Sequence, residues 1–389
     1  MERRSFLKLT ASAAGGLLVF PNFLSAENLL FGVEDHQDNV LIFIQLNGGN
    51  DGLNTFIPFE DPLYYANRPK IGIPKDKVIH ANNSLGFHPA LKDLATIAQE
   101  GNLTIVQNVG YPNPNRSHFR SQEIWQTAAG SKQYLDYGWL GRYLDIQCKE
   151  EDLAAVNVDN IDNLALKAAQ ASGLTIKDFN KISRYHTEDS VLKLSANPQL
   201  DFVRKLQYAS LEGMTEINKA LQNAQHFNET YANNPLAKNL EWMSKLIKGG
   251  LNSKIYYTSL SGFDTHNNQL QNHHKQLIIL NDALFSLYKD VKANNLLSKV
   301  TVVVFSEFGR RVKENGTGTD HGTAGPMIII GGKNKGKIVG KNANLNNLDN
   351  GDLIFEHDFR SVYATLLQHK LSFNPKLINI NNEAIKDIF

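Results

Sequence analysis

The chain has 389 residues, 42% of them hydrophobic, and its 40 basic and 39 acidic residues almost cancel. This length and composition predict one large globular domain, or a core with a cap, and give no electrostatic basis for binding nucleic acid or anionic membranes. The single cysteine, Cys148, excludes an intramolecular disulfide and a cysteine-ligated zinc site.

The first segment in chain order is a predicted export signal. A twin-arginine pair (Arg3 and Arg4) precedes an apolar run and a small-residue exit before residue 27. The run is too short for a membrane span, so residues 1–26 are predicted to be a Tat signal peptide that directs the chain to the periplasm or cell envelope. An ordinary amphipathic first helix is the alternative. No later segment is apolar for long enough to span a membrane.

Apolar runs alternate with amphipathic stretches along residues 27–389. The runs that predict buried strands are Val40–Leu46, Leu103–Val109, Leu153–Val158, Lys254–Leu260, Val300–Phe305 and Met327–Ile330. The stretches that predict helices are Pro89–Gln99, Ser121–Ala129, Pro198–Gln225, Pro235–Lys248, Gln269–Asn294 and Asp358–His369. This alternation is typical of an α/β fold with a mostly parallel central sheet covered by helices on both faces.

Two stretches depart from this rhythm. Residues 159–234 are polar, show no clear strand pattern and predict an inserted helical cap, with a long helical crossover inside one domain as the alternative. Residues 331–352 are rich in Asn, Lys and Gly and predict an exposed loop or an edge hairpin.

Carboxylates and histidines follow three of the predicted strands. Asp51 lies in a Gly/Asn loop after the first strand, and Asp264 and His266 follow the strand that ends near Leu260. Two residues apart in an extended segment, Asp264 and His266 point the same way and suit one metal ion. A local turn at Asp51 and a helix cap at Asp264 are the structural alternatives.

The third group lies near the end of the chain. Glu307 follows the Val300–Phe305 run, and Asp320 and His321 stand side by side in a Gly-rich loop. A salt-bridged Glu307 and a plain turn at Asp320 are the alternatives. Because ligands gather at the carboxyl ends of strands in open α/β sheets, the three groups together predict a metal site with mixed Asp, Glu and His ligation.

A candidate nucleophile follows the Leu103–Val109 strand. Ser117 stands near the start of a predicted helix, where backbone N–H groups stabilise an anion, and Arg116 could clamp an anionic group. The alternative is that Ser117 only caps the helix and that Arg116 is a surface residue.

Five motifs follow one another along the chain: Asn47-Gly-Gly-Asn-Asp-Gly52, Arg116-Ser-His-Phe119, Phe263-Asp-Thr-His266, Ser306-Glu-Phe-Gly-Arg310 and Gly318-Thr-Asp-His-Gly322. Together they resemble the Tat-exported "domain of unknown function 1501" family. The resemblance covers nearly all of residues 27–389. It implies membership of the alkaline phosphatase/sulfatase-like superfamily and therefore a three-layer α/β sandwich with a metal site at the strand ends.

The same resemblance implies roles for single residues. Asp51 matches a metal-bridging carboxylate, Ser117 the nucleophile, Asp264 and Glu307 ligand carboxylates, and His321 the last metal-binding histidine. Two positions depart from the superfamily pattern, because Phe308 and Asn268 stand where metal-binding histidines are usual. His266 and Asp320 are the residues that could replace them, in a site for one ion or two.

These features predict an exported metal-dependent hydrolase of phosphate or sulfate esters. Its expected cofactor is a divalent metal (Zn, Mn, Ca or Mg), and its expected partner is a small-molecule or polymer ester, with no nucleic acid. The alternative is a non-catalytic envelope protein that binds a carbohydrate or a protein on a degenerate hydrolase fold. The sequence predicts no oligomeric state.

Overall fold

The structure is a computed structural model that describes residues 19–21, 39–148, 153–169, 172–179, 195, 197–224 and 229–389. The described residues form two compact units. The larger unit contains residues 39–135, 229–241 and 258–389, and the smaller unit contains the others. Apart from residues 19–21, the predicted signal peptide lies outside the described residues. No helix in the described part of the chain combines the length and the apolar composition that a membrane span requires.

The larger unit is built on a mixed sheet with the strand order β2-β10-β11-β6-β12, and β15 also pairs with β6. β2, β12 and β15 make parallel pairs, whereas β11 runs antiparallel to both of its neighbours. The strands are β2 (Val40–Asn47), β6 (Leu103–Gly110), β10 (Val300–Ser306), β11 (Gly325–Gly331), β12 (Ile338–Val339) and β15 (His357–Asp358).

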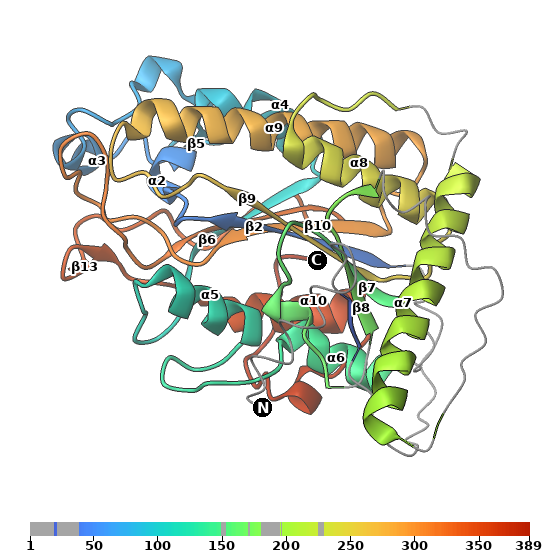
Figure 1. Ribbon diagram of the computed structural model, residues 1–389. Coiled ribbons are helices and arrows are strands. Elements are labelled where there is room, and N and C mark those ends of the chain that lie inside the picture. The colour runs from blue at the N-terminus through green and yellow to red at the C-terminus, as the bar shows by residue number, and fades with distance from the viewer. Residues whose placement is uncertain are drawn as a thin grey trace. The chain divides into compact units, whose positions relative to one another are not determined.

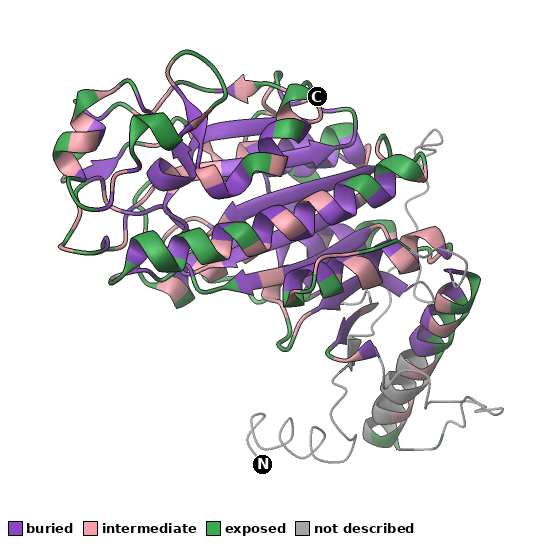
Figure 2. Cartoon of the chain, turned by 90° about the horizontal axis from the view of Figure 1, so that it is seen from above, coloured by how far each residue is buried: buried purple, intermediate pink, exposed green. Residues whose placement is uncertain are grey.

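Helices cover both faces of this sheet, which gives three layers in the larger unit. In Figure 1, α4 and α9 lie above the strands, and α5 and α10 lie below them. Figure 2 shows the strands buried beneath helices that alternate buried and exposed faces. The helices of these layers are α4 (Lys92–Gln99), α5 (His118–Thr127), α9 (Gln269–Ala293) and α10 (Phe359–Lys370). The predicted α/β fold class is therefore confirmed.

The sequence pattern explains the two central elements. β2 and β10 are almost entirely β-branched or apolar, and both are buried along nearly their whole length, as expected for strands with helices on each face. α9 buries Leu277, Leu280 and Leu284 at spacings of three and four residues, which is the apolar stripe of an amphipathic helix. Each such leucine contributes about 1.5–3 kcal/mol on burial.

Short elements complete the larger unit. A small three-stranded sheet has the order β3-β5-β4, and β13 pairs with β14 in a hairpin at the end of the predicted 331–352 loop. These elements are α2 (Gly52–Thr55), β3 (Phe56–Ile57), α3 (Pro62–Asn67), β4 (Ile79–His80), β5 (Gly86–Phe87), β13 (Leu348–Asp349) and β14 (Asp352–Leu353). The 3-10 helices are η1 (Lys75–Lys77), η2 (Pro89–Leu91) and η6 (Pro375–Ile378).

The smaller unit contains a second group of strands. β7 (Leu153–Val158) pairs in parallel with β8 (Ser172–Ile176) and with residues 255–257 of β9 (Ile255–Ser261), and β1 (Val19–Pro21) pairs antiparallel with β8. Its helices are α6 (Trp139–Gln147), η3 (Leu164–Leu166) and α7 (Pro198–Asn223), and α8 (Pro235–Lys248) has residues in both units. β8 lies in the 159–234 stretch, so the expectation of no strand there was wrong. Whether the stretch acts as a cap stays a prediction.

Candidate metal centre

Four loops and the start of one helix bring the candidate residues together within the larger unit. β2 and β10 run parallel and in register up to Leu46 and Ser306, so the residues that follow them emerge at the same edge of the sheet. The loop after β9 reaches this edge because the Phe263 amide donates to the Asn47 carbonyl, 3.2 Å away. Gly48 has a positive φ, and a Cβ there would overlap the backbone of Asp264. That glycine therefore allows the two loops to touch.

Three imidazoles converge on one carboxylate oxygen at this edge. The Nε2 atoms of His266 and His321 each lie 3.1 Å from Asp264 Oδ1, and His118 Nε2 lies 3.4 Å from it. His266 Nε2 and His321 Nε2 are only 2.9 Å apart. The candidate ligand atoms of His118, Asp264 and His321 all lie within 4.8 Å of one another. We call His118, Asp264, His266 and His321 the histidine cluster.

An oxygen stands behind each imidazole of the histidine cluster. His118 Nδ1 is 2.8 Å from Glu307 Oε1, and His321 Nδ1 is 2.8 Å from the Arg116 carbonyl oxygen. His266 Nδ1 faces Asp320 Oδ1 at 3.4 Å. Carbonyl and carboxylate oxygens only accept hydrogen bonds, so they favour a proton on the Nδ1 atom of each imidazole. The three Nε2 atoms point into the cluster.

Glu307 is fully buried and is held as an anion. Its Oε1 accepts from the Gly48 amide at 2.9 Å, and its Oε2 accepts from the Ser306 hydroxyl at 2.9 Å. Burial opposes ionisation, but the hydrogen bonds from His118, Gly48 and Ser306 outweigh it and keep the pKa of Glu307 below its usual value. The same hydrogen bond to Glu307 raises the pKa of His118.

Arg310 fixes the orientation of Asp264. Its buried guanidinium donates to Asp264 Oδ1 at 2.6 Å and to the carbonyl oxygens of Gly49, Phe263 and Thr319 at 2.8–3.0 Å. Burial opposes ionisation of Asp264, but the hydrogen bond and the positive charge of Arg310 outweigh it and help to lower its pKa to about 2. The carboxylate is therefore an anion at every physiological pH.

Asp51 is not part of this cluster. Its side chain is 1% exposed, and its Oδ2 accepts from Arg68 Nη1 at 2.6 Å and from the Gln269 amide. Its Oδ1 accepts from the Asn54 amide and so caps α2. Burial opposes ionisation of Asp51, but the charge of Arg68 outweighs it and lowers the pKa.

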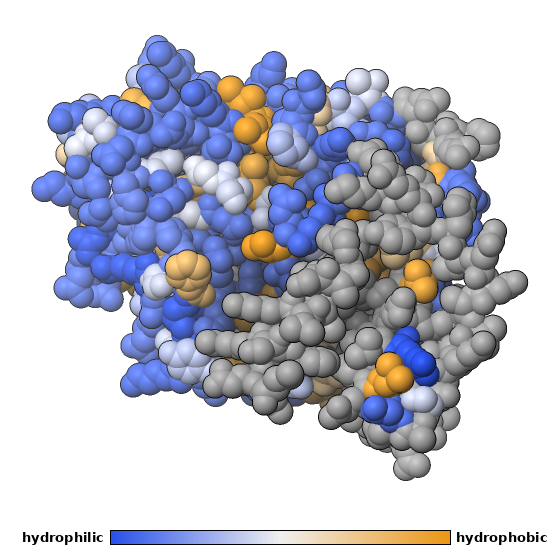
Figure 3. All heavy atoms as spheres, in the orientation of Figure 1, coloured by the Kyte–Doolittle hydropathy of each residue, from blue (hydrophilic) through white to orange (hydrophobic). Residues whose placement is uncertain are grey.

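Ser117 and Arg116 lie beside the histidine cluster at the start of α5. Ser117 is the exposed residue immediately before His118, and its hydroxyl does not cap the helix. Arg116 pairs with the buried Asp352, and its carbonyl contacts His321. Phe119 is 88% exposed on the other side of His118. The described surface in Figure 3 is otherwise mostly hydrophilic, with separate small apolar patches.

The histidine cluster is open to solvent. The side chains of Asp264 and His266 are 49% and 39% exposed, and those of His118 and His321 are 25% and 22% exposed. Phe308 is buried and packs on the rings of His118 and His321, with centroids 4.9 Å from each.

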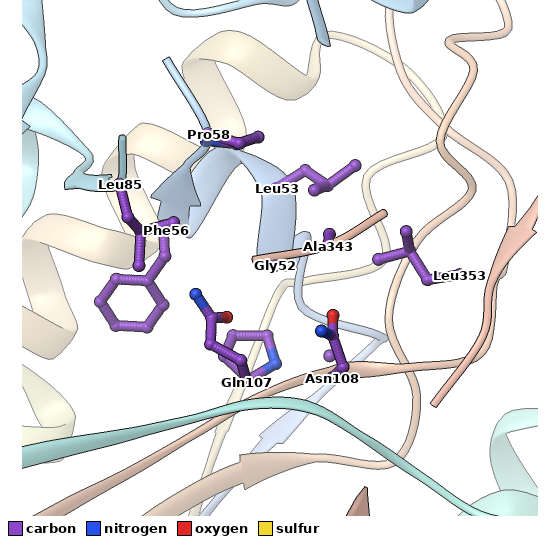
Figure 4. Close-up of a pocket in the computed structure, with 11 residues that line it drawn as sticks. Gly52, Leu53, Phe56, Pro58, Leu85, Gln107, Asn108, Ala343 and Leu353 are labelled. Carbon is purple, nitrogen blue, oxygen red and sulfur yellow. The ribbon is translucent and has the colours of Figure 1, made fainter. Parts of the chain in front are cut away.

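A separate pocket in the larger unit begins at Gly52, next to Asp51. Figure 4 shows the amides of Gln107 and Asn108 pointing from β6 towards apolar side chains that include Leu53 and Phe56. None of the histidine-cluster residues lines this pocket.

The predicted site residues thus fall into three groups in the structure. It brings Asp264, His266 and His321 together, places Glu307 and Asp320 behind two of the imidazoles, and leaves Asp51 in a different network. The sequence interpretation missed the site roles of His118, Arg310, Arg68 and Gln269. His118 and Arg310 stood inside two of the quoted motifs and could have been found there, whereas Arg68 and Gln269 carry no sequence signal.

Several solved structures share a distant likeness with this chain. The C-terminal periplasmic domain of EcEptC from Escherichia coli in complex with Zn is 11% identical, with 76% of this chain and 74% of that chain covered and a TM-score of 0.39. A protein in the alkaline phosphatase superfamily from Vibrio parahaemolyticus is 11% identical over 97% and 78%, with a TM-score of 0.37. The alkaline phosphatase from the Antarctic bacterium TAB5 is 11% identical over 75% and 91%, with a TM-score of 0.34.

None of the curated proteins matches this sequence. Residues 38–368, which are most of the chain, match the family described as "Protein of unknown function (DUF1501)". The match contains all five motifs of the predicted resemblance, from the Asp51 loop to the His321 loop. The chain therefore belongs to the DUF1501 family.

Proposed function

We propose that this chain binds one divalent metal ion at the histidine cluster and uses it to hydrolyse a phosphate or sulfate ester. The observation that carries the proposal is the convergence of three Nε2 atoms on Asp264 Oδ1, each with its Nδ1 held by an oxygen from behind. Two unprotonated imidazole nitrogens 2.9 Å apart repel each other unless a cation or a proton lies between them. A metal ion removes that conflict.

The donor set fits Zn²⁺ better than Mg²⁺ or Ca²⁺. Zn²⁺ takes imidazole nitrogen and carboxylate oxygen in four-coordinate sites, whereas Mg²⁺ and Ca²⁺ prefer sets made of oxygen. The oxygens behind His118 and His321 are the usual supports of metal-binding imidazoles. When bound, such an ion stabilises the oxygens of an ester undergoing displacement.

The residues around the cluster supply the other parts of an ester hydrolysis. Ser117 presents an exposed hydroxyl one residue from His118, and the N–H groups at the start of the ten-residue helix α5 stabilise negative charge there. In the proposed reaction the Ser117 oxygen attacks the phosphorus or sulfur atom, and its proton goes to the departing alcohol. Water then cleaves the seryl ester, which releases phosphate or sulfate and restores the Ser117 hydroxyl. If water attacks directly instead, it supplies the proton to the alcohol and its oxygen to the product. Arg116 precedes Ser117 in the chain and pairs with Asp352; in the proposed reaction its remaining N–H groups would contact the ester oxygens.

The test measures metal content and turnover in parallel. Wild-type protein should contain one ion per chain, and His266→Ala and His321→Ala should lose it, whereas His80→Ala, at an exposed histidine outside the cluster, should keep it. Ser117→Ala should keep the ion and lose hydrolysis of chromogenic phosphate and sulfate esters if Ser117 is the nucleophile. A metal-free, stable wild type would refute the metal centre, and a loaded wild type without esterase activity on any ester would refute the hydrolase.

One observation favours a second function. The histidine cluster offers four protein donors, and closed four-coordinate sites are typically structural. Phe308 also packs against two of the imidazoles as a rigid apolar wall. In this case the ion stabilises an exported envelope protein that binds a carbohydrate or a protein partner. Azide added to Co²⁺-loaded protein discriminates the two, because an open ion changes its visible spectrum and a closed one does not.

Export through the Tat pathway belongs to the same proposal and rests on Arg3 and Arg4. Replacement of both arginines by lysine should retain the chain in the cytoplasm on cell fractionation. Periplasmic recovery of that variant would refute Tat export. In the periplasm or cell envelope, the proposed substrate is a small or polymeric ester.

A further inference from the structure

We propose that Asp51 and Gln269 position the metal ligands from behind, without binding the ion, by tying together the two loops that carry Asp264, His266 and His321. This inference rests on the proposed metal centre. It assigns a role to a buried polar network that the metal-binding residues themselves do not explain.

Gln269 is the link between the two loops. It is fully buried at the start of α9, and its Oε1 accepts from the Thr265 hydroxyl at 3.2 Å and from the Thr319 hydroxyl at 2.6 Å. Thr265 stands between Asp264 and His266 in the chain, and Thr319 directly precedes the Asp320–His321 pair. A single amide oxygen therefore holds both ligand-bearing loops.

The other end of the Gln269 amide is anchored on Asp51. Gln269 Nε2 donates to Asp51 Oδ2, which also accepts from Arg68. The Asp51 carboxylate can only accept, so the amide nitrogen of Gln269 must face it, and the amide oxygen then faces the two threonine hydroxyls. These hydrogen bonds fix the Gln269 side chain in one position, and its contacts with Thr265 and Thr319 then fix the two loops.

Protein groups already hold both oxygens of Asp51. Arg68 and Gln269 donate to Oδ2, and the Asn54 amide donates to Oδ1 at 3.3 Å. Arg68 in turn donates to the carbonyl oxygens of Val312 and Arg311, each at 2.9 Å, so the pair is tied to the loop after β10. The guanidinium already supplies the positive charge that the buried carboxylate needs. The network therefore predicts a centre with one ion and an indirect role for Asp51.

The experiment titrates Co²⁺ into full-length wild-type, Gln269→Leu, Asp51→Asn and Thr319→Val proteins and records stoichiometry, Kd and visible absorption. Gln271→Leu is the matched control, because Gln271 is an exposed glutamine on the same helix. We expect one Co²⁺ per chain in every protein. Gln269→Leu should weaken binding about tenfold and change the absorption bands, as loss of a residue that supports metal ligands does.

Thr319→Val removes only the hydrogen bond from Thr319 to Gln269, so it reports on positioning even if Gln269→Leu does not fold. We expect it to change the Kd and the absorption bands in the same direction as Gln269→Leu, but by less. Two ions in the wild type and one in Asp51→Asn would overturn the inference, because Asp51 would then be a ligand. Unchanged Kd and absorption in both Gln269→Leu and Thr319→Val would overturn it as well. A wild type that binds no Co²⁺ would overturn the metal centre and this inference together, whereas Co²⁺ binding without esterase activity would leave the inference standing and remove only the hydrolase.

Discussion

The most informative single substitution at the centre is Glu307→Gln, because Glu307 supports a proposed ligand without being one. Glu307 Oε1 lies 2.8 Å from His118 Nδ1, and the residue is fully buried. A glutamine keeps the size and an oxygen acceptor but removes the charge. Hydrogen bonds to a charged group contribute about 1.5–3 kcal/mol and neutral ones about 0.5–1.5 kcal/mol, so the change costs about 1 kcal/mol. That cost corresponds to about fivefold in metal affinity.

The assay is competition for Zn²⁺ with a chromophoric chelator at fixed pH, with thermal unfolding of the same samples as a check on the fold. We expect Glu307→Gln to bind about fivefold to tenfold more weakly with one ion per chain retained. This is at or below the roughly tenfold to hundredfold effect of losing such a partner, because glutamine keeps an oxygen acceptor. Glu100→Gln serves as the control, since Glu100 pairs with Lys292 on the surface of the larger unit. Glu307→Gln with wild-type affinity, alongside His118→Ala with lost affinity, would refute the support role of Glu307.

Three further predictions concern stability. Burial lowers the pKa of His88 to about 3 and of His273 to about 4, so the unfolded chain binds more protons than the folded chain below pH 6.5. Urea titrations should therefore show that the free energy of unfolding falls by about 3 kcal/mol between pH 6.5 and pH 5.0. A His273→Gln variant whose free energy of unfolding falls equally steeply with pH would contradict this. Excess chelator should lower the melting temperature of the wild type, while His321→Ala should be insensitive to it, and equal shifts in both would place the ion elsewhere. Arg68→Leu should destabilise the fold by about 3–5 kcal/mol because it leaves the Asp51 carboxylate buried and unpaired, and addition of Asp51→Asn should recover part of that loss in urea unfolding.

The main elements could be predicted from the sequence because their patterns are long. β2 and β10 are continuous apolar runs, and α9 repeats its leucines at helical spacing over 25 residues. β8 was missed because its sequence, Ser172–Ile176, starts with Ser-Gly and offers only a short apolar pattern. The antiparallel course of β11 had no sequence signal either, since strand direction depends on how the chain returns and not on the strand's own residues.

The site shows a different limit of sequence reasoning. The sequence identified the loops that meet, because acidic residues and histidines stand directly after predicted strands. It could not distinguish a ligand from the residue behind a ligand, because Glu307 and Asp320 stand in the same motifs as the residues of the histidine cluster. It also gave no sign of Arg68, which stands outside the quoted motifs, yet Arg68 is what separates Asp51 from the cluster.

The exposure of the cluster bears on whether a bound ion would be catalytic or structural. A closed structural site is expected to be shielded, yet the Asp264 and His266 side chains are 49% and 39% exposed. Asp264 Oδ1 also receives a hydrogen bond from Arg310 at 2.6 Å, and that contact competes with an ion for the same oxygen. In the proposed centre, three imidazoles and a carboxylate that Arg310 also holds would bind the ion and leave room for solvent or substrate, as in catalytic zinc sites. Lysine has a shorter side chain and fewer N–H donors than arginine, so Arg310→Lys should free Asp264 to bind a metal ion more tightly. Metal affinity should then rise while turnover falls. Higher turnover together with tighter metal binding would exclude this competition.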